Sequence, residues 1–208
     1  SLEKLVDGVV PKMIYYYDAP TDDVRDIAKS SVRMRDYLII NTPDLIDNAN
    51  RGAYSGTVVS NDLLKRTIKY TNYNYDQEFL KTKHIRNSPL MNNKDYSDTV
   101  QSNIRFVPKH FSSCDTITNH ADEIERMSLA RRAQLMHMGS YKIEILVPGD
   151  SNRKVGEIIE ARIPAPEKGK GRLDRVLSGK WLTTKVQHTI QSGQHEFNTR
   201  LHLVTDSI

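Results

Sequence analysis

The sequence predicts an α+β chain: a peripheral mixed lobe carrying short helices over residues 1–118, and a helix followed by an antiparallel β-barrel, tube-like domain over residues 119–208. The first part is rich in Asn, Asp and Tyr and has few long apolar patterns. The second part has one long helical stretch, followed by segments in which apolar and polar residues alternate. Its last two segments predict a hairpin with one apolar and one polar face, which is typical of a barrel wall.

Composition and charge exclude several broad classes of protein. With 208 residues and 38% hydrophobic content, the chain can form one large core or two small ones. Its 30 basic and 26 acidic residues give a net charge of +4, a weak preference for polyanionic partners. Cys114 is the single cysteine, so an internal disulfide is excluded, and no apolar run approaches the ~20 residues that cross a bilayer.

Two short helices are predicted in the first part. One covers Thr21–Met34 and begins with acidic residues, which the helix dipole favours in a first turn. The other begins with Thr42 as N-cap and Pro43 at the first position, and ends at Gly52.

Strands follow these helices. Ala53–Val59 and Leu64–Tyr73 predict two strands joined by a turn at residues 60–62. Aromatic and polar residues are interspersed at the end of the second strand, which indicates a half-buried strand edge or, alternatively, a base-stacking surface formed by Tyr70, Tyr73 and Tyr75. Between His84 and Ser113 no pattern is evident, so we expect a long loop with short strands.

In the second part, Asn119 is expected to cap a helix that runs to about Met138 and stops at Gly139. Alternating residues then predict a strand over Tyr141–Val147, and a second strand over Ile158–Ile163.

The terminal hairpin pairs Lys180–Ile190 with His195–Thr205. If Ile190 opposes His195, an apolar face holds the pairs Leu182/Leu203, Thr184/Leu201, Val186/Thr199 and His188/Phe197. The polar face then holds the pairs Thr183/His202, Lys185/Arg200, Gln187/Asn198 and Thr189/Glu196. In this register Lys185 and Arg200 form an unfavourable like-charge pair.

No metal or cofactor site is expected. His188, His195 and His202 invite a metal hypothesis, but the predicted register puts His202 on the face opposite the other two. A Cys-based zinc site would need more thiolates than Cys114 alone.

No catalytic residues are expected either, so the chain is predicted not to be an enzyme. Cys114 lacks a recognisable oxyanion arrangement around it. Acidic pairs occur at predicted helix starts, where the helix dipole already explains them: Asp22/Asp23 and Asp122/Glu123.

A basic region surrounds the Gly/Lys/Pro-rich loop at residues 165–175. Its members are Arg153, Lys154, Lys168, Lys170, Arg172 and Arg175. They predict either a solvated loop or a contact with an acidic partner surface or with passing DNA.

Two stretches of the sequence resemble the central baseplate hub proteins of contractile-tailed (T-even-like) bacteriophages. The first contains Gly52-Ala-Tyr54-Ser55, Asn61-Asp62-Leu63, Arg66 and Tyr73-Asn-Tyr75. The second is similar to a closing barrel segment that hub and related spike proteins share, and contains Val147-Pro148-Gly149-Asp150, Val155-Gly156-Glu157-Ile158, Leu177-Ser178-Gly179-Lys180-Trp181-Leu182, Val186-Gln187-His188-Thr189-Ile190 and Thr199-Arg200-Leu201-His202-Leu203.

This resemblance implies a homotrimer whose barrels form a pseudo-sixfold ring in the virion tail baseplate, assembled in the host cytoplasm. The ring would contact the hexameric tail tube protein, the trimeric central spike protein and the surrounding baseplate wedge proteins, with DNA only in transit through its channel and no small-molecule substrate. Hub proteins of this type usually carry another barrel before the part present here, which is the main departure from the family's pattern. The sequence does not start with Met, so we expect either processing or a fragment. Two alternatives stay open: a barrel-type module that binds single-stranded nucleic acid through the tyrosines and the basic loop, and a tail-associated peptidoglycan hydrolase.

Overall fold

The computed structural model describes residues 10–17, 32–62, 66–90, 104–109, 124–165, 173–191, 193 and 196–208. The described residues form two compact units, interleaved along the chain. Unit 1 lies within Ser1–Thr42, His84–Ser88 and Tyr141–Ile208, and unit 2 within Pro43–Lys83 and Pro89–Ser140. The predicted boundary between residues 118 and 119 falls outside the description and stays a prediction.

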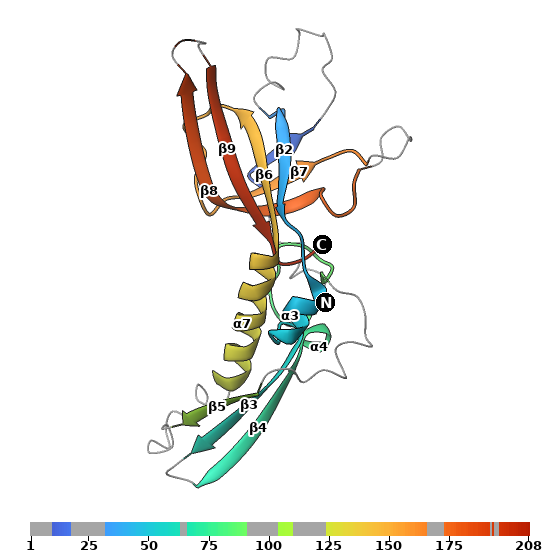
Figure 1. Ribbon diagram of the computed structural model, residues 1–208, viewed down its shortest axis with the longest axis vertical. Coiled ribbons are helices and arrows are strands. Elements are labelled where there is room, and N and C mark those ends of the chain that lie inside the picture. Colours follow the sequence, from blue (N-terminus) through green and yellow to red (C-terminus); the bar gives the residue numbers. More distant parts are fainter. Residues whose placement is uncertain are drawn as a thin grey trace. The chain divides into compact units, whose positions relative to one another are not determined.

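Unit 1 is built on a six-stranded sheet (Figure 1). Its strands are β1 (Met13–Tyr16), β2 (Asp36–Asn41), β6 (Tyr141–Pro148), β7 (Ile158–Arg162), β8 (Gly179–Gln191) and β9 (Glu196–Thr205). They lie in the order β1-β7-β8-β9-β6-β2, and every pairing is antiparallel except that of β1 with β7. The α+β class is therefore confirmed, with more strand than helix among the described residues.

The six-stranded sheet is open, so the prediction of a closed barrel was wrong. Closure requires a continuous hydrogen-bonded ladder between the two edge strands. Among the described residues, β1 meets the segment before β2 in one isolated bridge, Tyr16 with Arg33. Two backbone hydrogen bonds support that bridge, from Tyr16 N to Val32 O (3.1 Å) and from Met34 N to Tyr16 O (2.8 Å).

One face of this sheet forms the core of unit 1. Strand β6 alternates buried and half-buried residues along its whole length, as the sequence predicted. The rings of Tyr141 and Trp181, both buried, lie 5.2 Å apart between centroids. The other buried side chains on this face include Tyr15, Ile143, Ile145, Val147, Ile159, Ala161, Leu201 and Leu203.

The β8–β9 hairpin forms, but its register differs from the predicted one. Gln191 pairs with Glu196 and Ile190 with Phe197, so each residue from Lys185 to Gln191 lies two positions from its expected partner, whereas Leu182 and Thr183 lie one position from theirs. A slip of two keeps every side chain on its predicted face, because side chains alternate along a strand. A bulge at Thr184 then reverses the faces, and Trp181 and Thr183 are buried where Leu182 was expected.

The corrected register removes the expected like-charge pair. Lys185 pairs with His202, and Arg200 pairs with Gln187. Arg200 also lies 3.3 Å from Glu144 of the neighbouring strand, measured between Nη1 and Oε1. Ile190, which set the predicted register, is 74% exposed near the hairpin tip.

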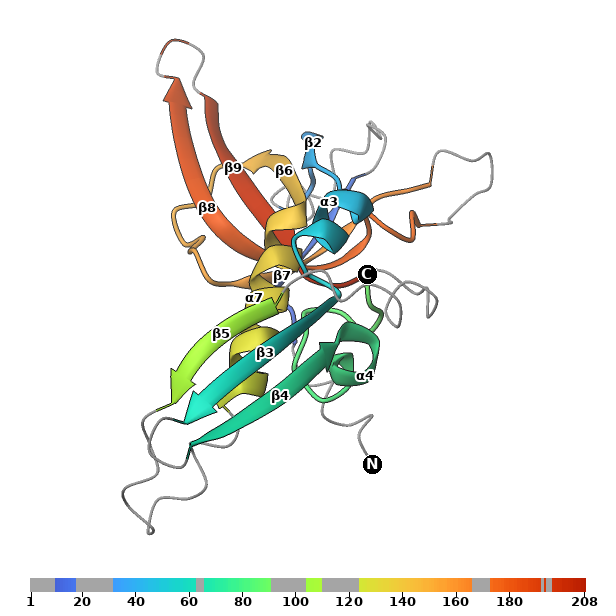
Figure 2. The same ribbon diagram turned by 60° about the horizontal axis from the view of Figure 1, so that its bottom comes forward.

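Unit 2 combines a three-stranded sheet with three described helices. The strands are β3 (Ser55–Asp62), β4 (Thr67–Asn74) and β5 (Ile104–Lys109), and the helices are α3 (Leu45–Asn50), α4 (Tyr75–Phe79) and α7 (Ile124–Ser140). The strand order is β4-β3-β5, with β4 antiparallel and β5 parallel to β3. Figure 2 shows α7 lying along one face of this sheet.

Helix α3 confirms the predicted short helix, with a different cap. Asp44 is the N-cap, and its side chain accepts hydrogen bonds from the backbone amides of Ile46 and Asp47. Thr42 and Pro43 precede the helix, and Asp44, a more favourable N-cap than threonine, takes the capping position. Gly52 ends the helix as predicted, with a positive φ of 79°.

Strands β3 and β4 form the predicted hairpin with a later turn. Residues 60–62, expected in the turn, continue β3 and pair with residues 67–69 of β4. Their polar side chains resemble a turn signal, but the backbone ladder and the burial of Ser60 and Asp62 keep them in the strand.

Helix α7 runs past its predicted stop at Gly139 to Ser140, where β6 begins at the next residue. The side chain of Ser140 donates a hydrogen bond to Met136 O (2.7 Å), and Asn48 Nδ2 donates one to Ser140 Oγ (3.0 Å). These bonds fix the last turn without a glycine cap. The predicted N-cap Asn119 lies outside the described residues, as does most of the predicted helix Thr21–Met34.

Among the described residues, no helix is long and apolar enough to cross a membrane.

Candidate interaction surfaces

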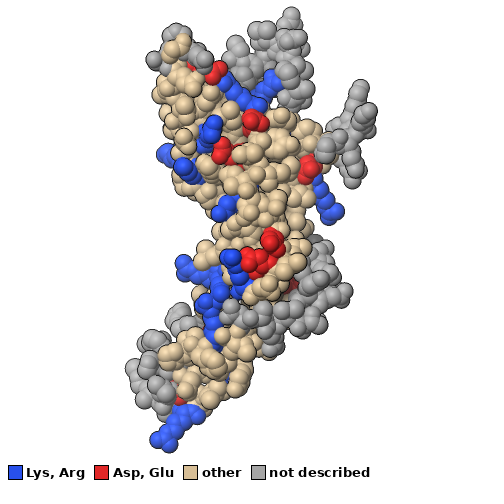
Figure 3. All heavy atoms as spheres, viewed as in Figure 1, with Lys and Arg blue, Asp and Glu red and all other residues tan. Residues whose placement is uncertain are grey.

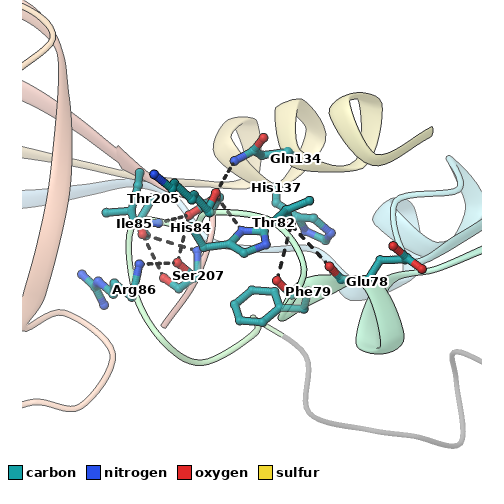
Figure 4. Close-up of polar contacts among 12 residues, drawn as sticks. Glu78, Phe79, Thr82, His84, Ile85, Arg86, Gln134, His137, Thr205 and Ser207 are labelled. Atoms are coloured by element: carbon teal, nitrogen blue, oxygen red, sulfur yellow. Dashed lines mark hydrogen bonds and ion pairs between the residues drawn. The ribbon is translucent and has the colours of Figure 1, made fainter. Parts of the chain in front are cut away.

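The segment His84–Ser88 forms a strap across the C-terminal residues of unit 1 (Figure 4). The carboxylate of Asp206 lies 2.9 Å from His84 Nδ1 and accepts a hydrogen bond from Ile85 N at 3.0 Å. Backbone atoms of Ser88 and Ile208 exchange two hydrogen bonds, at 3.0 and 2.7 Å. This strap lies inside the stretch in which the sequence showed no pattern.

Arg86 is the buried centre of the strap. Its Nε and Nη1 atoms donate hydrogen bonds to the carbonyls of Lys180 and Val176, both at 2.8 Å. Burial lowers the pKa of Arg86 to about 10, an effect that Tyr141 and Asp206 partly oppose. The guanidinium therefore stays charged at neutral pH, and its role is structural.

An apolar surface covers one face of the sheet in unit 2. We call it the open sheet face, and it consists of Ile68 (60% exposed), Tyr70 (71%), Ile104 (59%) and Phe106 (79%). Tyr70 and Phe106 flank Val59 in one row across the three strands, so all of these side chains share a face.

The opposite face of this sheet is covered by α7. Val58 and Tyr73 point to that side, where they pack with Leu129 and Ala133 of the helix. The open sheet face is therefore the side without a helix among the described residues. Contiguous exposed apolar surface of this kind usually marks a contact with another protein.

Strand β2 carries a second exposed apolar surface, in unit 1. It is an edge strand, and Leu38, Ile39 and Ile40 are 60%, 42% and 47% exposed. Leu38 and Ile39 oppose Glu144 and Ile143 of β6, so they lie on different faces of the sheet. An edge strand with apolar side chains on both faces is a surface on which another chain can pack.

The predicted tyrosine surface for nucleic-acid bases does not form. Tyr73 and Tyr75 are buried in the core of unit 2 with Phe79 and His137, and only Tyr70 is exposed. Burial raises the pKa of Tyr73, with a further contribution from Glu78. The expected strand edge is confirmed, since β4 is an edge of the described sheet.

The predicted basic region is only partly described. Arg153, expected in a solvated loop, is buried: its Nε donates a hydrogen bond to Tyr15 Oη at 2.8 Å. Lys154 and Arg175 are exposed, whereas the remaining members, Lys168, Lys170 and Arg172, lie outside the described residues. Its role against protein or DNA stays a prediction.

The residues considered as metal ligands or catalytic groups do not lie together where the structure describes them. The side chain of His188 contacts Thr199 Oγ1 at 3.0 Å, and that of His202 lies 3.7 Å from Glu144 on the other face. In the part of the chain that the structure describes, no three His, Cys, Asp or Glu side chains gather as a metal site. The description does not cover His195, Cys114, Asp22, Asp23, Asp122 and Glu123.

Several glycines of the family-like motifs occupy positions that require glycine. A Cβ atom on Gly149 would lie 2.0 Å from the ring of Phe197. Gly156 and Gly179 have positive φ angles of 86° and 131°. Beside Gly179, the hydroxyl of Ser178 donates to Ile163 O at 2.8 Å and accepts from Ile163 N at 2.9 Å. These motifs therefore specify turns and packing.

Comparison with known proteins finds similarity at the level of structure. No model of a known family matches the chain, and no curated protein matches it. Among solved structures, it is similar to the tail protein from Neisseria meningitidis MC58, with 9% identity and a TM-score of 0.45. The match covers 97% of this chain and 46% of that one, so this chain spans less than half the length of that protein. At these values the likeness by itself shows nothing about the function of this chain.

Proposed function

We propose that this chain is a structural component of a phage-tail baseplate hub, which acts by binding other proteins and catalyses no reaction. The observation that carries the proposal is the open sheet face. Its four exposed apolar side chains belong to three paired strands, so they form a preorganised surface. Burying such a surface against a partner is favourable by roughly 25 cal/mol per Å².

The assignment to a phage tail rests on the two family-like stretches of sequence. In the second stretch, the glycines, Ser178 and Trp181 occupy turn and core positions in unit 1, as expected of a motif that specifies a fold. The apolar edge strand β2 offers a further packing surface. We infer a homotrimer in the tail baseplate, in contact with the tail tube protein, the central spike protein and the wedge proteins.

The first test is the oligomeric state of the protein. Sedimentation velocity and electron microscopy of the purified chain are expected to give a particle with threefold symmetry. A chain that stays monomeric over the accessible concentration range would contradict the trimer.

The second test asks whether the open sheet face is the contact surface. Tyr70→Ser combined with Phe106→Ser should weaken assembly without lowering the thermal unfolding temperature, because both side chains are mainly exposed. Leu80→Ser is the matched control and should leave assembly unchanged. Leu80 is also an apolar residue, 66% exposed, and follows directly after α4. Equal effects of the two variants would argue against this surface.

A further inference from the structure

Three arginines line one groove on the side of unit 2 opposite the open sheet face. The groove measures about 470 Å³ and lies between β5 and α7. Its lining residues are Arg105, Ser128, Arg131, Arg132, Leu135 and Met136. Along α7, Ser128, Arg131 and Leu135 follow one another at three or four positions, and Arg132 and Met136 each lie next to one of them, so the five residues form one continuous stripe. We call this stripe together with Arg105 the arginine groove.

The charges of the arginine groove are not neutralised by the described residues. Among the described residues, neither Arg105 nor Arg131 has a carboxylate within ion-pair distance, and Arg132 donates one hydrogen bond, to the carbonyl of Arg51 at 3.4 Å. Arg126, on the same helix, is by contrast paired with Glu78. Basic side chains gather over the part of the surface that α7 occupies (Figure 3).

The arginines of the groove also repel one another. Burial and then the positive charge of Arg105 lower the pKa of Arg132. An anionic group placed between these guanidiniums would remove that repulsion and accept charge-assisted hydrogen bonds. Such a group would complement the charge of the described residues of the site.

We propose that the arginine groove binds an acidic segment of a partner protein, whose carboxylates contact Arg105, Arg131 and Arg132. The apolar side chains Leu135 and Met136 beside the guanidiniums suit a peptide that mixes acidic and apolar residues. None of the described residues that line the groove is aromatic, so they offer no platform for stacking nucleic-acid bases. This inference does not depend on the assignment to a phage tail.

The experiment measures binding of the full chain to a labelled synthetic peptide of glutamates with interspersed leucines, by fluorescence anisotropy. Removing two of the guanidiniums, in Arg105→Gln combined with Arg131→Gln, should weaken binding at least ~10-fold. Lys154→Gln combined with Lys185→Gln removes the same charge at two exposed lysines of unit 1, and should change binding less than about twofold.

Three outcomes would overturn the proposal. The first is equal weakening by both double variants, which would indicate a net-charge effect. The second is the absence of peptide binding by the unmodified chain. The third is tighter binding of a single-stranded oligothymidylate that the Arg105→Gln/Arg131→Gln variant abolishes, which would assign the groove to nucleic acid. Should the double variant unfold, Arg131→Lys is the substitute: it keeps the charge but loses bidentate hydrogen bonding, and should still weaken peptide binding.

Discussion

The guanidinium carbon of Arg86 lies 4.5 Å from the centroid of the Trp181 ring. Trp181 is the largest fully buried side chain of the described residues, and Arg86 covers it from the strap. A cation over an indole ring is favourable, and more so when both groups are shielded from water. The strap is thus attached to the six-stranded sheet by stacking as well as by hydrogen bonds.

Arg86→Lys should destabilise the fold. Lysine cannot reproduce the two hydrogen bonds to Lys180 and Val176 while stacking on the ring, so we expect a loss of about 2–3 kcal/mol in the free energy of unfolding. Denaturant unfolding followed by tryptophan fluorescence measures this directly, because Trp181 is the single tryptophan. An unchanged unfolding midpoint would contradict the role of Arg86.

Two glycines should respond with opposite sign to replacement by alanine. Gly179→Ala is expected to cost roughly 1–3 kcal/mol, because φ there is 131° and the new Cβ would lie 3.0 Å from the guanidinium of Arg86. Gly139→Ala, in α7, meets no atom within 4 Å and should stabilise by about 0.5–1 kcal/mol. Thermal unfolding of both variants tests the pair.

Leu201 and Lys185 lie on opposite faces of the hairpin, so substitutions at these two residues should have very different effects on stability. Leu201→Ala removes a fully buried side chain and should cost roughly 2–5 kcal/mol. Lys185→Glu changes an exposed residue opposite His202 and should leave the unfolding temperature nearly unchanged. The reverse result, with Lys185→Glu unfolded and Leu201→Ala unaffected, would mean that the faces are exchanged.

Glu78 should make the stability of unit 2 dependent on pH. Burial alone would raise the pKa of Glu78, but hydrogen bonds and charges from Lys81 and Arg126 outweigh it, and the net shift is downward. A carboxyl group whose pKa is lowered on folding stabilises the fold above its unfolded pKa of about 4.3, and this contribution is lost as the pH falls through the folded pKa.

Glu78→Gln should therefore lower stability at pH 7 by at most ~1 kcal/mol, since Lys81 and Arg126 are largely exposed. The difference from the unmodified chain should shrink as the pH falls below about 4. Urea unfolding at a series of pH values measures it, with Asp47→Asn, at an exposed ion pair of α3, as the control. A difference that is constant with pH would contradict the ion-pair explanation.

Local patterns in the sequence were sufficient for several elements. The alternation in Tyr141–Val147 identified β6 and its buried face, because side chains of a strand point to opposite sides regardless of context. The end of α3 at Gly52 was likewise predictable, because a positive φ there favours glycine.

Features that depend on several segments were beyond the sequence. The predicted register of the hairpin was wrong by two residues near its tip. A shift of two leaves the pattern of faces unchanged, so only packing selects between such registers. The bulge at Thr184 places Trp181 in the core, and this placement depends on packing against neighbouring strands of the sheet.

The sequence by itself determined that the chain is α+β, that strands form at β3, β4 and β6 to β9, and which faces of β6 and β9 are apolar, because these properties follow from residue spacing. Only the tertiary structure decided the open sheet, the strap at Arg86 and the arginine groove. Each of these brings together residues far apart in the chain, and a contact between distant residues is fixed by the free energy of the whole packed unit, which no local pattern records.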